Sequence, residues 1–478
     1  MPRGRRALGA AAAVALVCLM AAGAALARTR PRARLLFAGD VMLSRQVRLE
    51  RERTGREPWD SLAPLLASAD WAGANLEGAV GPDSSCAAAD PSLCFAMDED
   101  APERLAAAGF DAVSVENNHA ADLGGAGRAR TLRALARAGV LGADFEGSPR
   151  FVRVGDVTVA IVAVTLVPGS DGRVQAIPSL AVAQRLRLAR SLANVVVASV
   201  HWGTELQDWP NAAQRMAAEW LVDHGADVVV GHHPHVVQQP ECVHGRPVFF
   251  SLGNHVFDQR YPQTKEGLVA DCEVSGRHVR CGGVRTHAMR GSAVPVVAGR
   301  LPEAALAECA APVHPSLTYA GWTLRPEAWS PATADSGGVV IEAWRGGELR
   351  WRTRRVALVA VSPGVTSGDG RTFLLSLERH RSDMDGEIAV RPHVYELGDD
   401  GLVARWRGTA LAWPLLDAVV DSAGNVCALH RGDSFVRIDP STTETRTMRY
   451  RWNGFGFSAV RDESGACART YADGIAEH

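Results

Sequence analysis

The sequence runs VVVGHHPH over residues 228–235, where three valines lead into three histidines within four positions. The valines predict a buried strand that ends at the histidines. Four other stretches repeat this order of an apolar run followed by polar residues: LLFAGD at 35–40, WAGANLE at 71–77, VSVENNH at 113–119 and VVVASVHWG at 195–203. Because helical stretches separate these runs, the pattern predicts a layered α/β domain.

Helices and turns can be assigned between the strands. We expect helices over 59–69, 127–138 and 211–224; the second is followed by Gly139 and the third ends near Gly225, both good helix stops. A Gly155-Asp156 turn between two apolar runs predicts a β-hairpin.

The polar residues that end the five strands are expected to lie together. In α/β sheets, ligands collect at the carboxyl ends of the strands. The five stretches bring an aspartate, a glutamate, an asparagine and several histidines to that edge. Imidazoles bind zinc, iron or manganese, and carboxylates can bridge two cations. Each stretch alone is an ordinary turn, but together they predict a site for one or two divalent ions, of manganese, iron or zinc.

Six motifs then follow in an order that resembles the CapA family of capsule and poly-gamma-glutamate biosynthesis proteins. They are GDVML at 39–43, NLE at 75–77, NNHAAD at 117–122, HWGTE at 201–205, GHHPH at 231–235 and SLGN at 251–254. The resemblance covers about residues 34–273, roughly half of the chain. This family is related to the calcineurin-like metallophosphoesterases, which implies their layered α/β fold and a metal-dependent hydrolase.

The resemblance also implies the roles of individual metal ligands. Asp40 would bind a first metal, Glu77 would bridge two metals, and His235 would return to the first. The second metal would be held by Asn118, His201 and His233. Glu205 would orient one of the histidines without binding metal itself.

The remaining roles concern proton transfer and the substrate. By resemblance, His119 would protonate the leaving group and Asp122 would hold its ring. An imidazole suits this task because it titrates at about pH 6.5. Arg45 would contact a phosphate or carboxylate of the substrate, with an ordinary surface arginine as the alternative.

Three positions depart from the family pattern. Met42 stands where the wider superfamily has a histidine ligand, which predicts a weaker first site. Glu77 replaces a shorter aspartate as the bridge. His255 stands where the family usually has phenylalanine, and we expect it to pack beside the site, with an additional ligand as the alternative.

The N-terminus and the cysteines indicate export. Three arginines precede an apolar stretch that ends in an A-x-A site, so residues 1–27 are predicted to be a cleaved signal peptide, with a retained membrane anchor or a lipoprotein at Cys18 as alternatives. The chain has 9 cysteines, and removal of Cys18 leaves an even number, which favours disulfides in a periplasmic or envelope-associated protein. Cys86 with Cys94, and Cys272 with Cys281, are expected to form local bridges; the sequence does not pair Cys242, Cys309, Cys427 and Cys467.

The chain changes character after about residue 280. Its 478 residues suggest two or three domains, and turn signals separate short strands from residue 337 onward. We therefore predict a metallophosphoesterase-like domain at 34–300 and a C-terminal all-β domain at 335–478, of meander or partial propeller type. Tryptophans 406, 413 and 452 in the second domain are either core residues or a sugar-binding surface.

Two functions fit these observations. The first is an exported metal-dependent hydrolase that acts on a phosphoester, amide or ester bond during capsule or poly-gamma-glutamate synthesis. The alternative is a non-catalytic polymer-binding or export factor that retains the fold. In both cases the expected partner is an envelope polymer or its precursor, and the net charge of −2 predicts no general attraction to nucleic acid.

Overall fold

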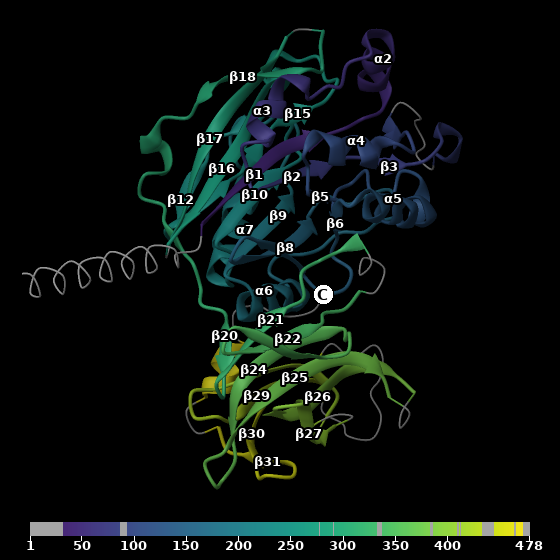
Figure 1. Cartoon of the computed structure of the whole chain (residues 1–478). Helices are drawn as coiled ribbons and strands as arrows, with labels where there is room; N and C mark the ends of the chain where they lie inside the picture. The colour runs from purple at the N-terminus through teal and green to yellow at the C-terminus, as the bar shows by residue number, and fades with distance from the viewer. Residues whose placement is uncertain are drawn as a thin grey trace, which may run out of the picture.

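The computed structural model describes residues 32–86, 93–276, 278–289, 291–331, 337–382, 386–408, 411, 413–432, 444–462 and 465–471 (Figure 1). The predicted signal peptide at 1–27, Cys18 and a predicted strand at 434–438 lie outside these residues. Within the described residues, no helix combines the length and the apolar character needed to cross a membrane.

A nine-stranded sheet contains the first three of the predicted strands. Its order is β18 (Pro295–Arg300), β17 (His278–Ala288), β16 (Glu266–Ser275), β1 (Arg32–Val41), β2 (Trp71–Leu76), β5 (Ala112–Ser114) and β6 (Leu141–Ala143), with β15 (Asn254–Val256) on β1 and β19 (Ala311–Pro312) on β17. The strands from β1 to β6 are parallel, so their carboxyl ends meet at one edge.

A six-stranded sheet contains the other two predicted strands. Its order is β12 (Glu241–Val243), β13 (Arg246–Phe249), β10 (Val228–His232), β9 (Val195–His201), β8 (Val157–Thr165) and β7 (Arg150–Val154). β13, β10, β9 and β8 are parallel, whereas β7 and β8 form the predicted hairpin around Gly155. The hairpin prediction is therefore confirmed.

The two sheets pack against each other because alternate residues of their strands are apolar. Leu35 and Phe37 of β1 lie in one buried cluster with Val195 and Val197 of β9. The intervening residues of each strand face outward, toward helices. Burying each such side chain contributes about 1.5–3 kcal/mol, so the paired sheets form a stable core.

Helices cover the outer faces of both sheets (Figure 1). The nine-stranded sheet packs against α2 (Arg45–Thr54), α3 (Ala63–Leu66), α4 (Ala101–Ala108) and α5 (Gly124–Ala138), and the six-stranded sheet packs against α6 (Leu180–Leu192) and α7 (Ala212–Asp223). The mixed α/β class predicted for this part is confirmed.

The helix predictions differ in accuracy for identifiable reasons. The helices predicted at 127–138 and 211–224 are α5 and α7, and Asn211 with Gln214 forms a capping box at the start of α7. The helix predicted at 59–69 is instead a 3-10 turn (Asp60–Leu62) followed by the four-residue α3. Pro64 lacks an N–H and favours the first turn of a helix, so the chain restarts there.

The described residues of the C-terminal part form three successive four-stranded antiparallel sheets, each with neighbouring strands in sequence order. They are β20 (Leu317–Tyr319), β21 (Trp322–Pro326), β22 (Ile341–Arg345) and β23 (Glu348–Arg352); β24 (Leu358–Thr366), β25 (Thr372–Arg381), β26 (Ile388–Gly398) and β27 (Gly401–Arg407); and β28 (Leu415–Val420), β29 (Val426–Arg431), β30 (Thr445–Trp452) and β31 (Phe457–Val460). Among the described residues of this part, a short helix, α8 (Ala466–Thr470), departs from an all-β arrangement. In the first sheet, β21 lies before residue 335, where the C-terminal domain was predicted to begin, and β22 lies after it, yet the two strands pair. The predicted domain boundaries stay a prediction.

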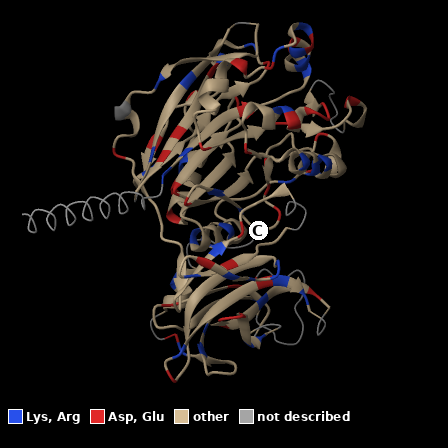
Figure 2. Cartoon of the chain, viewed as in Figure 1, with Lys and Arg blue, Asp and Glu red and all other residues tan. Residues whose placement is uncertain are grey.

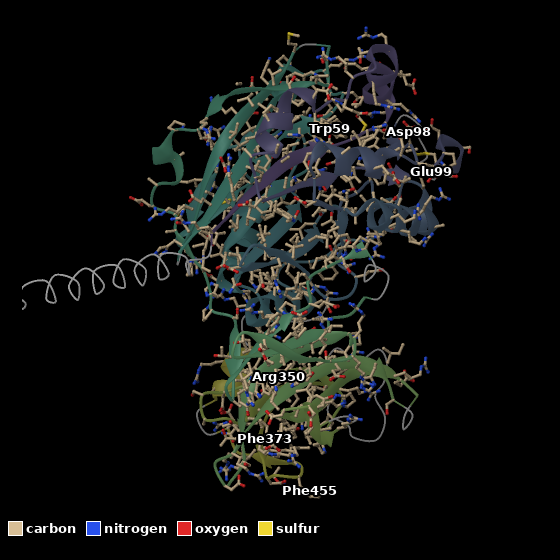
Figure 3. All side chains as sticks on the ribbon, viewed as in Figure 1. Trp59, Asp98, Glu99, Arg350, Phe373 and Phe455 are labelled. Carbon is tan, nitrogen blue, oxygen red and sulfur yellow. A yellow bond between two sulfur atoms is a disulfide. The ribbon has the colours of Figure 1, made fainter. Side chains whose placement is uncertain are left out.

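Several aromatic residues of this part pack into its interior, whereas Phe455 is 84% exposed. Phe373, labelled among the C-terminal sheets in Figure 3, is buried. The fully buried Trp452 lies against it, with ring centroids 6.0 Å apart. Trp406 contacts Trp452 and Phe457. Trp452 is therefore a core residue and not part of a sugar-binding surface, the two alternatives that the sequence left open.

Four disulfides connect the described cysteines. The two predicted local bridges, Cys86–Cys94 and Cys272–Cys281, are present. The other four cysteines pair as Cys242–Cys309 and Cys427–Cys467. The first of these ties β12 to the chain after β18.

Helix α6 joins the α/β part to the C-terminal sheets (Figure 1). The buried carboxylate of Asp417 on β28 accepts hydrogen bonds from Gln184 and Arg187 of α6. Away from this junction, Figure 2 shows acidic and basic residues interspersed along both parts of the chain. Some of them form surface ion pairs, such as Arg345 with Asp399.

Candidate metal centre

The predicted ligands come from the ends of parallel strands in both sheets. Asp40 lies at the end of β1, and Glu77 directly follows β2. His201 is the last residue of β9, and His233 follows β10. Since the two sheets face each other, their carboxyl edges bring these side chains to one place.

The first group of ligands is Asp40, Glu77 and His235. One ligand atom from each lies within 4.8 Å of the others. His235 Nδ1 is 3.2 Å from Asp40 Oδ2, and His235 Nε2 is 3.8 Å from Glu77 Oε2. All three side chains are buried. The structure therefore brings together the residues predicted for the first metal and its bridge.

The second group is Asn118, His201 and His233. His201 Nε2 lies 2.8 Å from Asn118 Oδ1, and the rings of His201 and His233 are 4.8 Å apart between centroids. His201 Nδ1 is 3.8 Å from Glu77 Oε1. Glu77 thus lies between the two groups, in the position that a bridging carboxylate needs.

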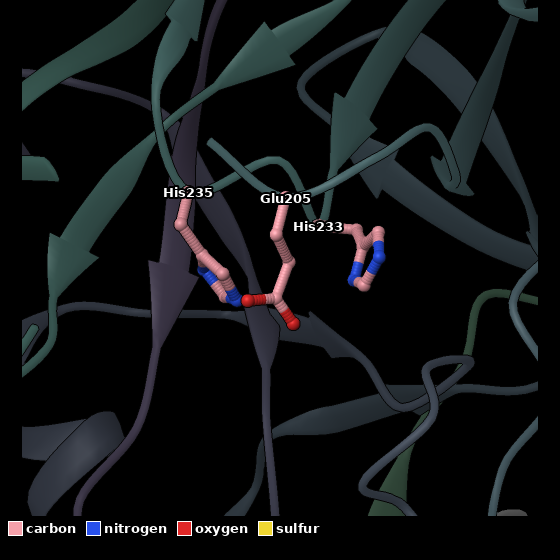
Figure 4. A group of neighbouring side chains, drawn as sticks. All are labelled: Glu205, His233 and His235. Carbon is pink, nitrogen blue, oxygen red and sulfur yellow. The ribbon is translucent and has the colours of Figure 1, made fainter. Parts of the chain in front are cut away.

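The backbone around the histidines is held in a rarely populated conformation. His233 has φ of 96° and His235 has φ of 59°, on either side of Pro234. Left-handed conformations cost non-glycine residues about 1–3 kcal/mol and persist where the surrounding structure imposes them. Here they turn both imidazoles toward Glu205 (Figure 4).

Two buried carboxylates create the electrostatics of the centre. Burial and the charge of Asp40 raise the pKa of Glu77 well above its usual value. Burial also raises the pKa of Asp40, but the imidazoles of His232 and His235 outweigh it and hold this pKa well below its usual value.

The histidines respond in opposite directions. Burial lowers the pKa of His235, but the carboxylates of Glu77 and Asp40 outweigh it and raise the pKa to about 9. Burial and neighbouring histidines lower the pKa of His201 well below its usual value and that of His233 to about 4. His201 and His233 are therefore neutral at pH 7, which is the form that binds metals.

The donor set fits divalent cations. Glu77 Oε2 and His233 Nδ1 are buried, and neither has a hydrogen-bond partner among the described residues. Unpaired buried polar atoms are costly, and a cation would satisfy the Glu77 oxygen and offset the repulsion between two buried carboxylates. Imidazole, carboxylate and amide oxygen together suit manganese, iron or zinc.

His119 and Asp122 lie beside the ligands. His119 Nδ1 is 2.9 Å from Asp122 Oδ2, which also accepts the backbone N–H of Phe95. The His119 ring stacks on Phe95, with centroids 3.8 Å apart. Asp122 therefore fixes the ring so that Nε2 is the nitrogen free to exchange a proton.

Arg45 also contacts Phe95, the residue on which the His119 ring stacks. Its guanidinium is 4.4 Å from the centre of the Phe95 ring, and its Nε is 3.1 Å from Asp258 Oδ2. The arginine is thus held near the centre by Asp258, and substrate contact stays a prediction.

The Glu205 carboxylate lies closer to His233 and His235 than a residue that only orients a ligand needs to be. One carboxylate oxygen of Glu205 and one ring nitrogen from each of His233 and His235 lie within 4.8 Å of one another. Figure 4 shows the carboxylate between the two rings. Glu205 is exposed, unlike the two histidines. The sequence predicts that Glu205 orients a histidine without binding metal. In the structure its carboxylate lies close enough to both histidines to bind the same metal ion.

Three asparagines near the ligands were not assigned roles from the sequence. Asn75 Nδ2 donates to Asp40 and Glu77 at 2.9 and 3.0 Å. Asn117 donates to Asn75, and Asn254 Oδ1 is 3.0 Å from His235 Nδ1. All three belong to the quoted motifs, which was the signal that could have identified them as residues that position ligands.

The structure also shows the surroundings of Met42 and His255, two residues that depart from the family pattern. Met42 is fully buried, and its sulfur accepts hydrogen bonds from Ser44 at 3.0 and 3.2 Å. His255 is buried against the edge of Phe110, and burial lowers its pKa to about 4. His232 Nδ1 lies 3.2 Å from Asp40 Oδ1, so this histidine also contacts the centre.

Comparisons with known proteins point to the same part of the chain. Residues 34–259 match the family described as bacterial capsule synthesis protein PGA_cap. The PGA biosynthesis protein CapA of Bacillus subtilis is 31% identical over 249 residues, which cover 49% of this chain and 65% of that protein. The capsule biosynthesis protein CapA of Bacillus anthracis is 29% identical over 262 residues, which cover 51% of this chain and 64% of that protein.

A third relative extends the comparison to another genus. A probable polyglutamine synthesis accessory protein of Mycobacterium tuberculosis is 28% identical over 287 residues, which cover 47% of this chain and 74% of that protein. The chain thus spans slightly less than two thirds of the length of the two Bacillus proteins. All ligands described above lie within the matched residues.

Proposed function

Residues 34–259 belong to the bacterial capsule synthesis protein family, and from this premise we propose that the chain is an exported, metal-dependent hydrolase of the phosphoesterase type. Its proposed role is the synthesis or processing of a capsule or poly-gamma-glutamate polymer. The relatives that are named for these polymers support the role. The four disulfides support an exported location, because such bonds persist in oxidising compartments.

One observation carries the catalytic proposal. Six side chains from five strand ends converge around Glu77, whose buried Oε2 has no hydrogen-bond partner in the described structure: Asp40, Glu77, Asn118, His201, His233 and His235. A chain that used this fold only as a scaffold would gain stability by replacing the two buried carboxylates with neutral residues. Retaining them is costly unless they bind cations.

The residues around the centre supply the remaining chemistry. A bound metal pair would neutralise charge on the substrate and activate a water nucleophile. Asp122 holds His119 Nδ1 at 2.9 Å, so the opposite nitrogen can deliver a proton to the leaving oxygen. Phe95 excludes water from one face of that ring and keeps it from rotating.

The test is hydrolysis of a generic phosphodiester, bis(p-nitrophenyl) phosphate, by the purified protein with added Mn²⁺. We expect turnover that is lost in EDTA and restored by Mn²⁺. A matched variant, Asp40→Asn, keeps the size of the side chain and should lose this activity. Equal rates for the variant and the unaltered protein would contradict the proposal.

A polymer-binding factor is the second candidate, and Met42 favours it. Thioether sulfur is a poor ligand for manganese or zinc, and this methionine occupies the position of a superfamily histidine. A binding factor would retain polymer on a filter or column without releasing phosphate from any phosphoester. Polymer retention by a protein that binds metal but has no turnover would select this candidate.

A further inference from the structure

A second group of metal-ligating side chains lies in the C-terminal sheets, outside the residues matched to the family. Glu378 and His380 are two residues apart on β25, so both project from one face of the sheet. His393 on β26 pairs directly with Ser376 and therefore shares this face. One ligand atom from each of the three lies within 4.8 Å of the others.

His380 is oriented as a metal ligand. Its Nδ1 is 3.0 Å from the backbone carbonyl of Arg381, and because a carbonyl only accepts, Nδ1 must carry the proton. Nε2 then has a free lone pair, and it is buried without a hydrogen-bond partner in the part of the chain described. Metal-bound histidines commonly donate their other ring N–H to a backbone carbonyl in this way.

Glu378 and His393 are nearly inaccessible to solvent. Their side chains are 6% and 4% exposed, and His393 Nδ1 is 3.1 Å from Glu378 Oε1. Tyr395 donates a hydrogen bond of 3.0 Å to the same oxygen, which leaves Oε2 for another partner. Arg354, whose side chain is 73% exposed, lies 4.0 Å from Oε2.

Glu378, alone among the three, lines a cavity of about 320 Å³ that lies between strands of the first and second C-terminal sheets and the end of α6. Glu378 and Tyr395 line it together with apolar residues such as Leu192, Trp351 and Leu374. Because Glu378 lines this cavity, a cation bound to its carboxylate could take a further ligand from the cavity.

We propose that Glu378, His380 and His393 form a second metal site, and that this site takes Zn²⁺. Two imidazoles and one carboxylate with an open position are a donor set that zinc accepts. The site is independent of the centre at Asp40 and of the proposed hydrolase activity. The alternative is a purely structural Glu–His–Tyr hydrogen-bond network, which would need no zinc.

The test isolates the second site by removing the first. The full chain with His233→Ala and His235→Ala is stripped with chelator, titrated with Zn²⁺ by calorimetry and compared with the same chain carrying an additional His380→Ala. His380 is half-buried and its side chain bonds only a neighbouring carbonyl, so this change should leave the fold intact. His278→Ala, at an exposed position on β17, serves as the matched control.

We expect His380→Ala to remove one equivalent of zinc or to weaken its binding at least tenfold, and His278→Ala to change nothing. Glu378→Gln should have the same effect as His380→Ala, since the amide oxygen still accepts the Tyr395 hydrogen bond. Identical zinc titrations with and without His380 would overturn the site. Loss of phosphodiester turnover plays no part in this result, so the two proposals fail separately.

Discussion

At the scale of single residues, the metal centre contains buried charged side chains that destabilise the fold when no metal is bound. Glu77 is fully buried next to Asp40, and this raises its pKa well above the usual value. Each pKa unit corresponds to about 1.4 kcal/mol between the charged and neutral forms. The ionised carboxylate therefore destabilises the metal-free fold.

This cost predicts opposite effects of Glu77→Gln on two measurements. The neutral, nearly isosteric amide should raise the free energy of unfolding of the metal-free protein by about 1–2 kcal/mol at pH 7. The same change should weaken metal binding. Urea denaturation in EDTA and a metal titration measure the two effects. A variant that is less stable than the parent protein in EDTA would show that Glu77 has a structural role instead.

His119 gives a prediction about turnover. It contacts Asp122 and Phe95 instead of the carboxylate pair, so His119→Ala should leave bound metal unchanged and lower kcat about 10²–10⁴-fold. Metal analysis and phosphodiester hydrolysis on the same sample are the measurements. Loss of metal along with turnover would mean that His119 is a ligand, and unchanged turnover would remove it from the mechanism.

At the scale of elements, His430 on β29 predicts a pH dependence of stability. Its Nδ1 is 3.0 Å from the carbonyl of Trp413, and Tyr450 donates to its Nε2 at 3.0 Å. Burial lowers the pKa of His430 to about 4, whereas an unfolded histidine titrates at about 6.5. The unfolded chain binds the proton more tightly, so this contribution is fully present above about pH 6.5 and is lost as the pH falls toward 4.

The expected loss reaches about 3 kcal/mol between pH 6.5 and 4. His430→Gln should flatten the corresponding part of the curve when urea unfolding is measured at several pH values. If the slope is the same in both proteins, His430 does not titrate as its surroundings indicate.

The elements also show how far the sequence could be interpreted. The β7–β8 hairpin follows from Gly155, which has φ of 57°, and α5 ends at a glycine that adopts the left-handed conformation. These signals are local. The helix expected at 59–69 is confirmed only over residues 60–66, where it begins as a 3-10 turn before α3. No helix was predicted over α6, whose apolar residues pack both on β8 and on the C-terminal sheets.

The site was predictable to a similar degree. Strand ends predicted which residues meet, and the structure brings Asp40, Glu77 and His235 together. The distance of Glu205 from the histidines could not be predicted, because it depends on the left-handed backbone at His233 and His235. Pairing of Cys242 with Cys309, 67 residues apart, depends on how β12 packs and not on spacing.

At the scale of the whole molecule, the junction at α6 holds the two parts together. Asp417 is fully buried and pairs with Arg187 and Gln184 across the junction. Asp417→Ala leaves both partners without their acceptor, and we expect a loss of about 2–3 kcal/mol in the free energy of unfolding.

The matched control for the junction is Asp399→Ala, which removes an ion pair whose partners are 46% and 77% exposed. Exposed pairs contribute about 0–1 kcal/mol, so this change should have little effect. Equal losses for the two variants in urea denaturation would show that the junction does not stabilise the molecule.

Anomalous diffraction from a crystal of the full chain soaked in Mn²⁺ tests the metal centre most directly. We predict a peak bounded by Asp40, Glu77 and His235, and a second peak near Asn118, His201 and His233. In the structure Glu77 lies beside His235 of the first group and His201 of the second. An ordered centre without an anomalous peak, in a crystal whose soak labels other sites, would contradict the account.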